Sequence, residues 1–257
     1  MNTAKHSIDC GPTVAFVFAR GGSKGLLDKN LRVLGGTTLV GRAVDAALAA
    51  ETVDRVVVST DSPAIAAVAR DHGAEVPWLR PRELATDTCP ERLAWRHACD
   101  EVEATSGPIG LFVSVPATAP LRHFSDIDRA VERYRAGSAD LVVTVAPARA
   151  SPYFTVVGMD AECGLGYLVD GGGRFARRQD APEVFEITPV AYVSTPQHIR
   201  SADRLFQGRV EGSVVPAERA VDIDDDLDLA FAEFLVDRAA AETRTAKVLS
   251  TASSIDR

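Results

Sequence analysis

The sequence predicts an α/β fold built on a mostly parallel β-sheet, and three observations support this. Short apolar runs rich in β-branched residues alternate along the chain with segments of about 10 to 15 residues that carry apolar side chains at helical spacing. That alternation is typical of βαβ units, in which helices connect parallel strands. Glycine-rich or polar residues follow the early strands directly, where ligands bind in sheets of this kind.

The predicted elements follow in chain order. Residues 14–18 form a short apolar run bounded by glycines, which predicts a buried strand. Residues 38–50 place two rows of apolar side chains at i, i+4 and i+8 on one helix face. A second strand at residues 55–59 precedes a helix that begins at Pro63 and ends before Gly73. The next predicted elements are strands at residues 74–79, 109–115 and 141–146, and helices at residues 89–105 and 124–135.

The alternating pattern breaks between about residues 147 and 189. Glycines interrupt this stretch, and Arg174, Arg177 and Arg178 cluster near its end. Long loops without structure are uncommon in compact domains, so we expect an inserted excursion with strands of its own. The pattern resumes at residues 190–193, and a final helix is predicted at residues 226–240. We expect one domain over residues 12–245, with flexible tails at residues 1–11 and 246–257.

Composition excludes several classes of protein. The 257 residues carry a net charge of −8, which argues against nucleic-acid binding because that binding depends on neutralising phosphate. No apolar run approaches the roughly 20 residues that a membrane span needs. The first twelve residues lack the apolar core of a signal peptide, so a cytoplasmic protein is expected. The four cysteines show no C-x-x-C spacing, which disfavours a zinc site or a disulfide framework.

The segment after the first strand has the features of a phosphate-binding loop. Three glycines within residues 21–25 allow backbone N–H groups to turn toward one point. Arg20, Lys24 and Lys29 add cations, and a triphosphate is an anion that would need them. The spacing matches neither the P-loop nor the dinucleotide fingerprint. A glycine-rich turn with solvated lysines is the alternative.

A second informative stretch lies at residues 221–228 and holds five aspartates. In an extended backbone, Asp222 and Asp224 point to the same side, where two carboxylates could hold Mg²⁺ together with substrate phosphates. Part of the EF-hand spacing is also present, but Leu227 stands where that loop needs glycine. Asp225 or Asp226 would instead cap the following helix, which is a structural role. A third interpretation of the stretch is an acidic helix start without metal.

Blocks spread over about residues 14–235 resemble the acylneuraminate cytidylyltransferases, the enzymes that make CMP-sialic acids. The blocks occur in family order and are ARGGSKG with the following Lys29-Asn30, VSTD (58–61), LRP (79–81) with ELATDT (83–88), TAPLR (118–122), Arg178-Gln179 and Asp222-Ile223-Asp224. The resemblance implies a Rossmann-like nucleotidyltransferase fold, CTP as donor, a Mg²⁺ cofactor and a homodimer. It also implies that the excursion supplies dimer contacts and reaches toward the partner's site.

The resemblance also implies a role for each matching residue. The nucleotide-binding residues would be Ala19, Arg20, Gly21, Gly22, Ser23, Lys29, Asn30, Arg80 and Thr118. The catalytic residues would be Arg20, Lys29, Asp222 and Asp224, with both aspartates binding metal. The acceptor-binding residues would be Arg178, Gln179 and Thr188.

Two departures from the family pattern fall in the acceptor half of the site. Pro116 stands where the sialic-acid enzymes carry glutamine, and Thr188-Pro189 stands where they carry Asn-Gly. The expected reaction is therefore transfer of CMP from CTP to a small acidic acceptor, a sugar acid of the nonulosonic or sialic type, with release of pyrophosphate. A 3-deoxy-ulosonate or phosphonate acceptor, another nucleoside triphosphate, and a non-catalytic nucleotide- or sugar-binding relative are alternatives.

Overall fold

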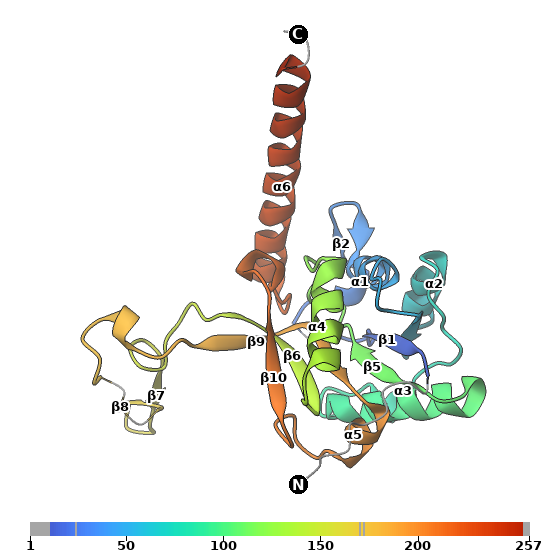
Figure 1. The fold of residues 1–257 in the computed structure, drawn as a ribbon, viewed down its shortest axis with the longest axis horizontal. Coiled ribbons are helices and arrows are strands. Elements are labelled where there is room, and N and C mark those ends of the chain that lie inside the picture. The colour runs from blue at the N-terminus through green and yellow to red at the C-terminus, as the bar shows by residue number, and fades with distance from the viewer. Residues whose placement is uncertain (1–10, 24, 170, 172, 254–257) are drawn as a thin grey trace.

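The computed structural model describes residues 11–23, 25–169, 171 and 173–253. A six-stranded sheet lies at its centre, with the strand order β10-β6-β9-β5-β1-β4 (Figure 1). β1 pairs in parallel with β4 and β5, and β10 pairs in parallel with β6. β9 runs antiparallel to both of its neighbours, so the prediction of a mostly parallel sheet is confirmed. The strands are β1 (Thr13–Phe18), β4 (Arg55–Ser59), β5 (Leu111–Ser114), β6 (Leu141–Pro147), β9 (Phe185–Ser194) and β10 (Val210–Val214).

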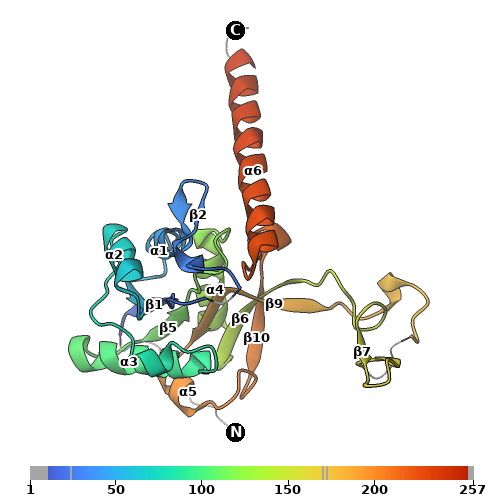
Figure 2. The same cartoon turned by 180° about the vertical axis from the view of Figure 1, so that it is seen from behind.

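Helices cover both faces of this sheet, which gives three layers (Figures 1 and 2). One face packs its alanine, valine and isoleucine side chains against α1 (Leu39–Leu48), α2 (Pro63–Asp71) and α4 (Phe124–Ala136). The other face packs against α3 (Glu91–Ser106) and α5 (Pro196–Ser201). On that second face Phe16 stacks on Phe112, whose ring also contacts Trp95. The layers leave the carboxyl ends of β1, β4 and β5 open at one edge.

Several short elements differ from the sequence prediction. The strand predicted at residues 74–79 is wrong: Glu75 alone bridges Val57, and Pro77 has no N–H with which to continue a ladder. The hairpin of β2 (Val33–Leu34) and β3 (Thr37–Thr38) was not predicted, nor were α5 and β10. The hairpin strands and α5 are too short to show a clear period, and β10 (VEGSV) lacks the continuous apolar run that marked the other strands. The 3₁₀ helices are η1 (Lys29–Leu31), η2 (Arg82–Leu84), η3 (Arg178–Asp180) and η4 (Ala217–Arg219).

The predicted excursion is present and has strands of its own. β7 (Val157–Met159) and β8 (Leu165–Tyr167) form an antiparallel hairpin that stands away from the central sheet (Figure 1). The excursion ends earlier than predicted, because β9 begins at Phe185, which pairs with Pro147 of β6. Large apolar side chains of the hairpin are exposed to solvent, with Met159 at 69% and Leu165 at 70%.

The last helix, α6 (Asp226–Ser253), is longer than the predicted 226–240 and projects beyond the body of the molecule (Figure 1). Its first turns pack Ala232 and Val236 against the side chains of Leu34 and Leu39. Residues 246–253 therefore continue this helix, whereas residues 1–10 and 254–257 of the expected tails lie outside the described residues. None of the described helices is both long and apolar enough to cross a membrane.

Candidate active site

The glycine-rich loop lies at the carboxyl end of β1, beside the end of β4. The Gly21 N–H donates a hydrogen bond of 2.8 Å to Asp61 Oδ1, and Asp61 follows β4 by two residues. The Arg80 N–H donates a bond of 2.7 Å to the Thr60 carbonyl, which ties the next segment to the same edge. The loop and Asp61 therefore meet at the carboxyl ends of two parallel strands, β1 and β4.

The acidic segment docks against the end of β5. The Ile223 N–H donates a hydrogen bond of 2.8 Å to the Thr118 carbonyl, and the Ile223 side chain is fully buried. Asp222 and Asp224, on either side of this anchor, both line the cleft above the strands. Their predicted placement on the same side is confirmed.

The loop and the acidic segment touch one another. A Cβ added to Gly25 would lie 2.6 Å from the Asp224 carbonyl oxygen, so this close approach needs glycine. Lys29 Nζ donates a hydrogen bond of 3.0 Å to Asp224 Oδ1. Arg20 pairs with Asp87 at 2.5 Å on the opposite wall. Cations suited to phosphate thus face carboxylates suited to a metal ion.

These groups surround a cavity of about 680 Å³, within the range typical of small-molecule sites. Eight of the predicted site residues line it: Arg20, Ser23, Lys29, Asn30, Arg80, Thr118, Asp222 and Asp224. Ala19, Gly21 and Gly22 belong to the same loop without lining the cavity. The lining residues that sequence reasoning missed include Asp87, Glu91, Ile187 and Tyr192. Asp87 and Glu91 fall in and just after the ELATDT block (83–88), which was their only signal in the sequence.

Buried polar groups are held in defined positions inside the cavity. Asn30 Nδ2 donates a bond of 2.8 Å to the Arg20 carbonyl, while Asn30 Oδ1 is buried without a partner among the described residues. Arg80 donates to Ser59 Oγ at 3.0 Å and lies over the Phe18 ring at 5.5 Å. Burial lowers the pKa of Arg80, and Asp61 opposes that shift. The unfilled acceptor of Asn30 is consistent with a polar ligand.

The acidic pair differs in environment. Asp222 opens toward the cleft, but the surrounding protein desolvates its carboxyl group and raises the pKa, while a hydrogen bond with Thr118 acts in the opposite direction. Asp224 is more exposed and takes the Lys29 ion pair. The described residues contain no cluster of three or more His, Cys, Asp or Glu side chains that could hold a metal ion. Two carboxylates next to a phosphate loop still fit Mg²⁺, which binds through one or two carboxylates plus substrate phosphates.

The helix-capping interpretation of the acidic stretch holds for one residue. Asp225 Oδ1 accepts bonds of 2.9 Å from the N–H groups of Leu227 and Asp228, and Asp228 Oδ2 accepts a bond of 3.1 Å from the Asp225 N–H. This reciprocal pair caps α6. Asp225, and not Asp226, is therefore the cap.

The predicted acceptor-binding residues do not come together within one chain. Thr188 is 4% exposed, and its hydroxyl donates to Thr144 Oγ1 at 3.3 Å on β6. Arg178 and Gln179 lie exposed on η3 of the excursion and line none of the three described cavities. Arg178 instead donates a bond of 2.7 Å to the Arg149 carbonyl.

A phosphate loop facing two carboxylates, across the carboxyl ends of a parallel sheet with helices on both faces, defines a nucleotidyltransferase. Comparison with known proteins agrees: the model of the family described as Cytidylyltransferase matches residues 14–156. The chain belongs to the cytidylyltransferase family, which confirms the resemblance of its sequence blocks.

Two relatives illustrate this membership, and one solved structure shares the fold. The chain is 30% identical over 221 residues to the CMP-N,N'-diacetyllegionaminic acid synthase of Campylobacter jejuni, covering 86% of this chain and 93% of that protein. It is 27% identical over 216 residues to the N-acylneuraminate cytidylyltransferase of Streptococcus agalactiae, covering 82% of this chain and 50% of that protein. The solved structure of CMP:2-keto-3-deoxy-manno-octonic acid synthetase complexed with CTP matches with a TM-score of 0.68 at 14% identity, covering 89% of this chain and 100% of that one, which confirms the nucleotidyltransferase fold.

Proposed function

We propose that the protein transfers CMP from CTP to a nonulosonic sugar acid, with Mg²⁺ as cofactor and with release of pyrophosphate. The observation that carries this proposal is the contact between the phosphate loop and the acidic segment, through Gly25, Lys29 and Asp224. This contact joins a triphosphate site to a metal site at one point. A protein that only binds nucleotide has no need of the two carboxylates.

The side chains have separable roles in this reaction. Arg20 and Lys29 would exchange their carboxylate partners for the CTP phosphates and neutralise the charge on the departing pyrophosphate. Loop N–H groups would orient the phosphate chain so that the acceptor oxygen meets the α-phosphorus in line. Asp222 and Asp224 would hold Mg²⁺, which supplies Lewis-acid stabilisation of the phosphoryl oxygens.

Part of the cleft wall is apolar, and we assign this part to the acceptor. Pro116, Ile187, Pro189 and Tyr192 line it, and neither proline offers a side-chain hydrogen bond. Such a wall favours an acid that carries acyl groups over one that presents several hydroxyls. The relative named for a doubly acetylated acid supports an acceptor of the legionaminic type.

A second copy of the chain would complete the acceptor site. Arg178 and Gln179 lie on the excursion, away from this chain's own cavity, and the hairpin beyond them exposes Val157, Met159 and Leu165. Exposed apolar side chains on a projecting hairpin are typical of a protein–protein contact. We therefore include a homodimer, in which each excursion reaches the other chain's cleft, in the proposal.

Pyrophosphate release tests the reaction directly. CTP, UTP, ATP and GTP would each be supplied with a panel containing N,N'-diacetyllegionaminate, N-acetylneuraminate, a 3-deoxy-ulosonate and a small phosphonate. We expect turnover with CTP and the diacetylated acid, and at least tenfold lower kcat/KM for N-acetylneuraminate. If N-acetylneuraminate is the best acceptor, our interpretation of Pro116 and Thr188-Pro189 is wrong. Binding of CTP without turnover on any acceptor would contradict the catalytic proposal.

A further inference from the structure

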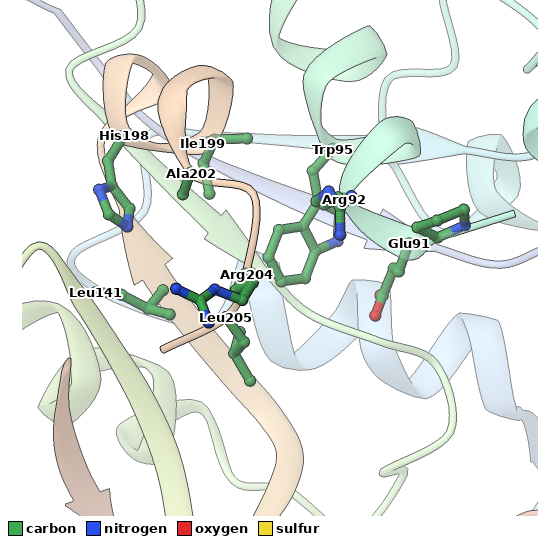
Figure 3. A pocket seen from close by; sticks show the side chains of 10 residues that line it. Glu91, Arg92, Trp95, Leu141, His198, Ile199, Ala202, Arg204 and Leu205 are labelled. Carbon is green, nitrogen blue, oxygen red and sulfur yellow. The ribbon is translucent and has the colours of Figure 1, made fainter. Parts of the chain in front are cut away.

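A second cavity lies between α3 and α5, next to the active-site cleft (Figure 3). Its volume is about 240 Å³, below the roughly 300–1,000 Å³ of sites for drug-sized ligands, so it suits a smaller molecule. Of the residues that line it, Glu91 alone also lines the cleft. The proposed transfer of CMP gives this cavity no role.

The joint between α3 and α5 is fixed by two arginines that do not line the cavity. Arg96 on α3 donates hydrogen bonds of 3.1 Å and 2.6 Å to the carbonyls of Ile199 and Ala202. In the opposite direction, Arg200 on α5 donates a bond of 2.8 Å to Asp100 Oδ1 on α3. Because these bonds hold the two helices together, the protein itself keeps the walls of the cavity in place.

The lining combines an apolar surface with two arginines of a different kind. Arg92 Nε is buried and has no hydrogen-bond partner among the described residues. Arg204, on the exposed segment after α5, forms no ion pair with any residue that the structure describes. The apolar lining residues are Pro90, Trp95, Leu141, Ile199, Ala202 and Leu205. Unpaired guanidinium groups beside an apolar surface suit an organic anion, because arginine donates paired hydrogen bonds to a carboxylate or phosphate group.

The arrangement of charge in the cavity indicates where the anionic group would lie. Figure 3 shows Arg204 on the side of Trp95 where Leu141 lies, whereas Glu91 extends from the other side of Trp95. A negative charge is attracted by the guanidinium and repelled by the carboxylate, so the anionic group belongs near Arg204. The apolar part of the ligand would then contact Trp95.

Trp95 also links the cavity to the cleft. Its ring centroid lies 5.6 Å from that of Tyr192 and 6.4 Å from that of Phe18. Both of these partners line the cleft, whereas Trp95 itself lines the second cavity. A ligand in this cavity therefore contacts the aromatic cluster that supports the cleft wall, and Trp95 can report its binding.

We propose that the cavity between α3 and α5 is a second ligand site, which binds a small organic anion. The carboxylate or phosphate group of the ligand accepts hydrogen bonds from Arg204, and its apolar body packs against Trp95 and Ile199. This site is separate from the cleft and does not depend on the proposed binding of CTP there.

The test uses Trp95 as a fluorescent reporter. The chain has two tryptophans and Trp78 lines neither cavity, so Trp78→Phe leaves Trp95 as the single source of indole fluorescence. This protein would be titrated with benzoate, phenyl phosphate, benzyl alcohol and inorganic phosphate, each with and without CTP and Mg²⁺. We expect saturable binding of benzoate or phenyl phosphate, and the tighter of the two identifies the anionic group. Benzyl alcohol lacks the charge and inorganic phosphate lacks the apolar body, so each should bind at least about tenfold more weakly.

Three variants in the Trp78→Phe background test the role of Arg204. Arg204→Gln should weaken binding of the tighter probe by about ten- to hundredfold, as expected for a lost hydrogen bond to a charged group. Arg204→Lys keeps the charge and should retain part of the affinity. Arg209→Gln is the matched control, because Arg209 pairs with Glu211 and does not line the cavity, and it should leave binding unchanged.

Four outcomes would overturn the inference. They are no saturable binding of either aromatic anion, equal losses in Arg204→Gln and Arg209→Gln, displacement of the probe by CTP, and binding of inorganic phosphate as tight as that of phenyl phosphate. Displacement by CTP would place the probe in the cleft instead. A protein that binds the probe through Arg204 but does not bind CTP would support this site while contradicting the proposed function.

Discussion

At the scale of single residues, Arg20 and Lys29 each face a carboxylate across the cleft. Arg20 pairs with Asp87, and Lys29 pairs with Asp224. The side chain of Lys29 is only 12% exposed, so its charge is little screened by water. A triphosphate and its metal ion would replace both pairs with stronger charge-assisted contacts.

Arg20→Ala and Lys29→Ala should therefore each weaken CTP binding by roughly ten- to a hundredfold, as expected for a lost hydrogen bond to a charged group. Calorimetric titration with CTP measures this directly. Arg32→Ala is the control, because Arg32 follows the same segment but lies outside the cleft. Near-normal affinity in both variants would show that the loop does not bind phosphate.

Asp224→Asn should lower Mg²⁺-dependent turnover by about two orders of magnitude, because asparagine removes the negative charge that binds the cation. The readouts are the rate and the Mg²⁺ concentration for half-maximal rate, together with the far-UV circular dichroism as a check of the fold. Asp226→Asn serves as control, since Asp226 lies at the helix start and does not line the cleft. Equal losses in the two variants would refute the assignment of Asp224 as a metal ligand.

At the scale of elements, the start of α6 combines the metal-binding segment with a helix cap. The carboxyl group of Asp225 bonds the N–H groups of the first turn, while Asp224 one residue earlier points into the cleft. Asp225 therefore stabilises the helix, whereas the neighbouring Asp224 is available to bind a ligand in the cleft.

Asp225→Ala should lower the free energy of unfolding by about 1 kcal/mol, the usual cost of losing an N-cap side chain. Urea denaturation followed by circular dichroism measures the difference. Asp226→Ala should change stability by less than about 0.5 kcal/mol, as is usual for an exposed position without such contacts. The reverse order of the two effects would contradict the capping assignment.

Gly25→Ala tests the contact between loop and acidic segment. The added methyl group would lie 2.6 Å from the Asp224 carbonyl oxygen, so the two segments must separate. Overpacking of this kind costs roughly 1–3 kcal/mol, and we expect at least about tenfold lower kcat/KM for CTP. Gly166→Ala in the excursion, where nothing in the same chain lies within 4 Å of the new methyl group, is the control and should leave CTP binding unchanged.

At the scale of the whole molecule, the excursion and α6 both project from the compact α/β body (Figures 1 and 2). The excursion carries exposed apolar residues at its tip and Arg178 near its base. A single chain buries neither, which is the physical reason for proposing a second copy.

Met159→Asp combined with Leu165→Asp should convert a dimer to a monomer, because charges in an apolar interface are costly to bury. Light scattering after size exclusion measures the mass. The monomer should still bind CTP but lose activity with the acceptor if Arg178 acts in the other chain's cleft. Glu162→Gln, in the turn of the same hairpin, should leave the mass unchanged. A monomeric unmodified protein with full activity would contradict the dimer proposal.

The sequence by itself determined the local features of this protein. A strand followed by glycines and cations can form an anion-binding loop from local backbone geometry alone, so residues 14–25 predicted the phosphate loop. The alternation of strands and helices predicted the layered fold, and the period of an extended chain placed Asp222 and Asp224 on one side. The direction of a strand and the length of a helix were harder to predict. An apolar run does not reveal that β9 is antiparallel to its neighbours. The helix α6 continues past residue 240 because no glycine or proline follows to end it.

Only the tertiary structure decided which of these features meet. Lys29 and Asp224 are 195 residues apart, and their contact depends on the docking of Ile223 onto the end of β5. The Arg122 guanidinium is buried and donates to the carbonyls of both Pro116 and Pro189, so two separate departures from the family pattern form one wall. Glu91 lies just after the ELATDT block (83–88) but belongs to no motif itself, and its place in the cleft follows from the packing of α3 against the sheet. Contacts between distant segments depend on the whole fold, and no local pattern encodes them.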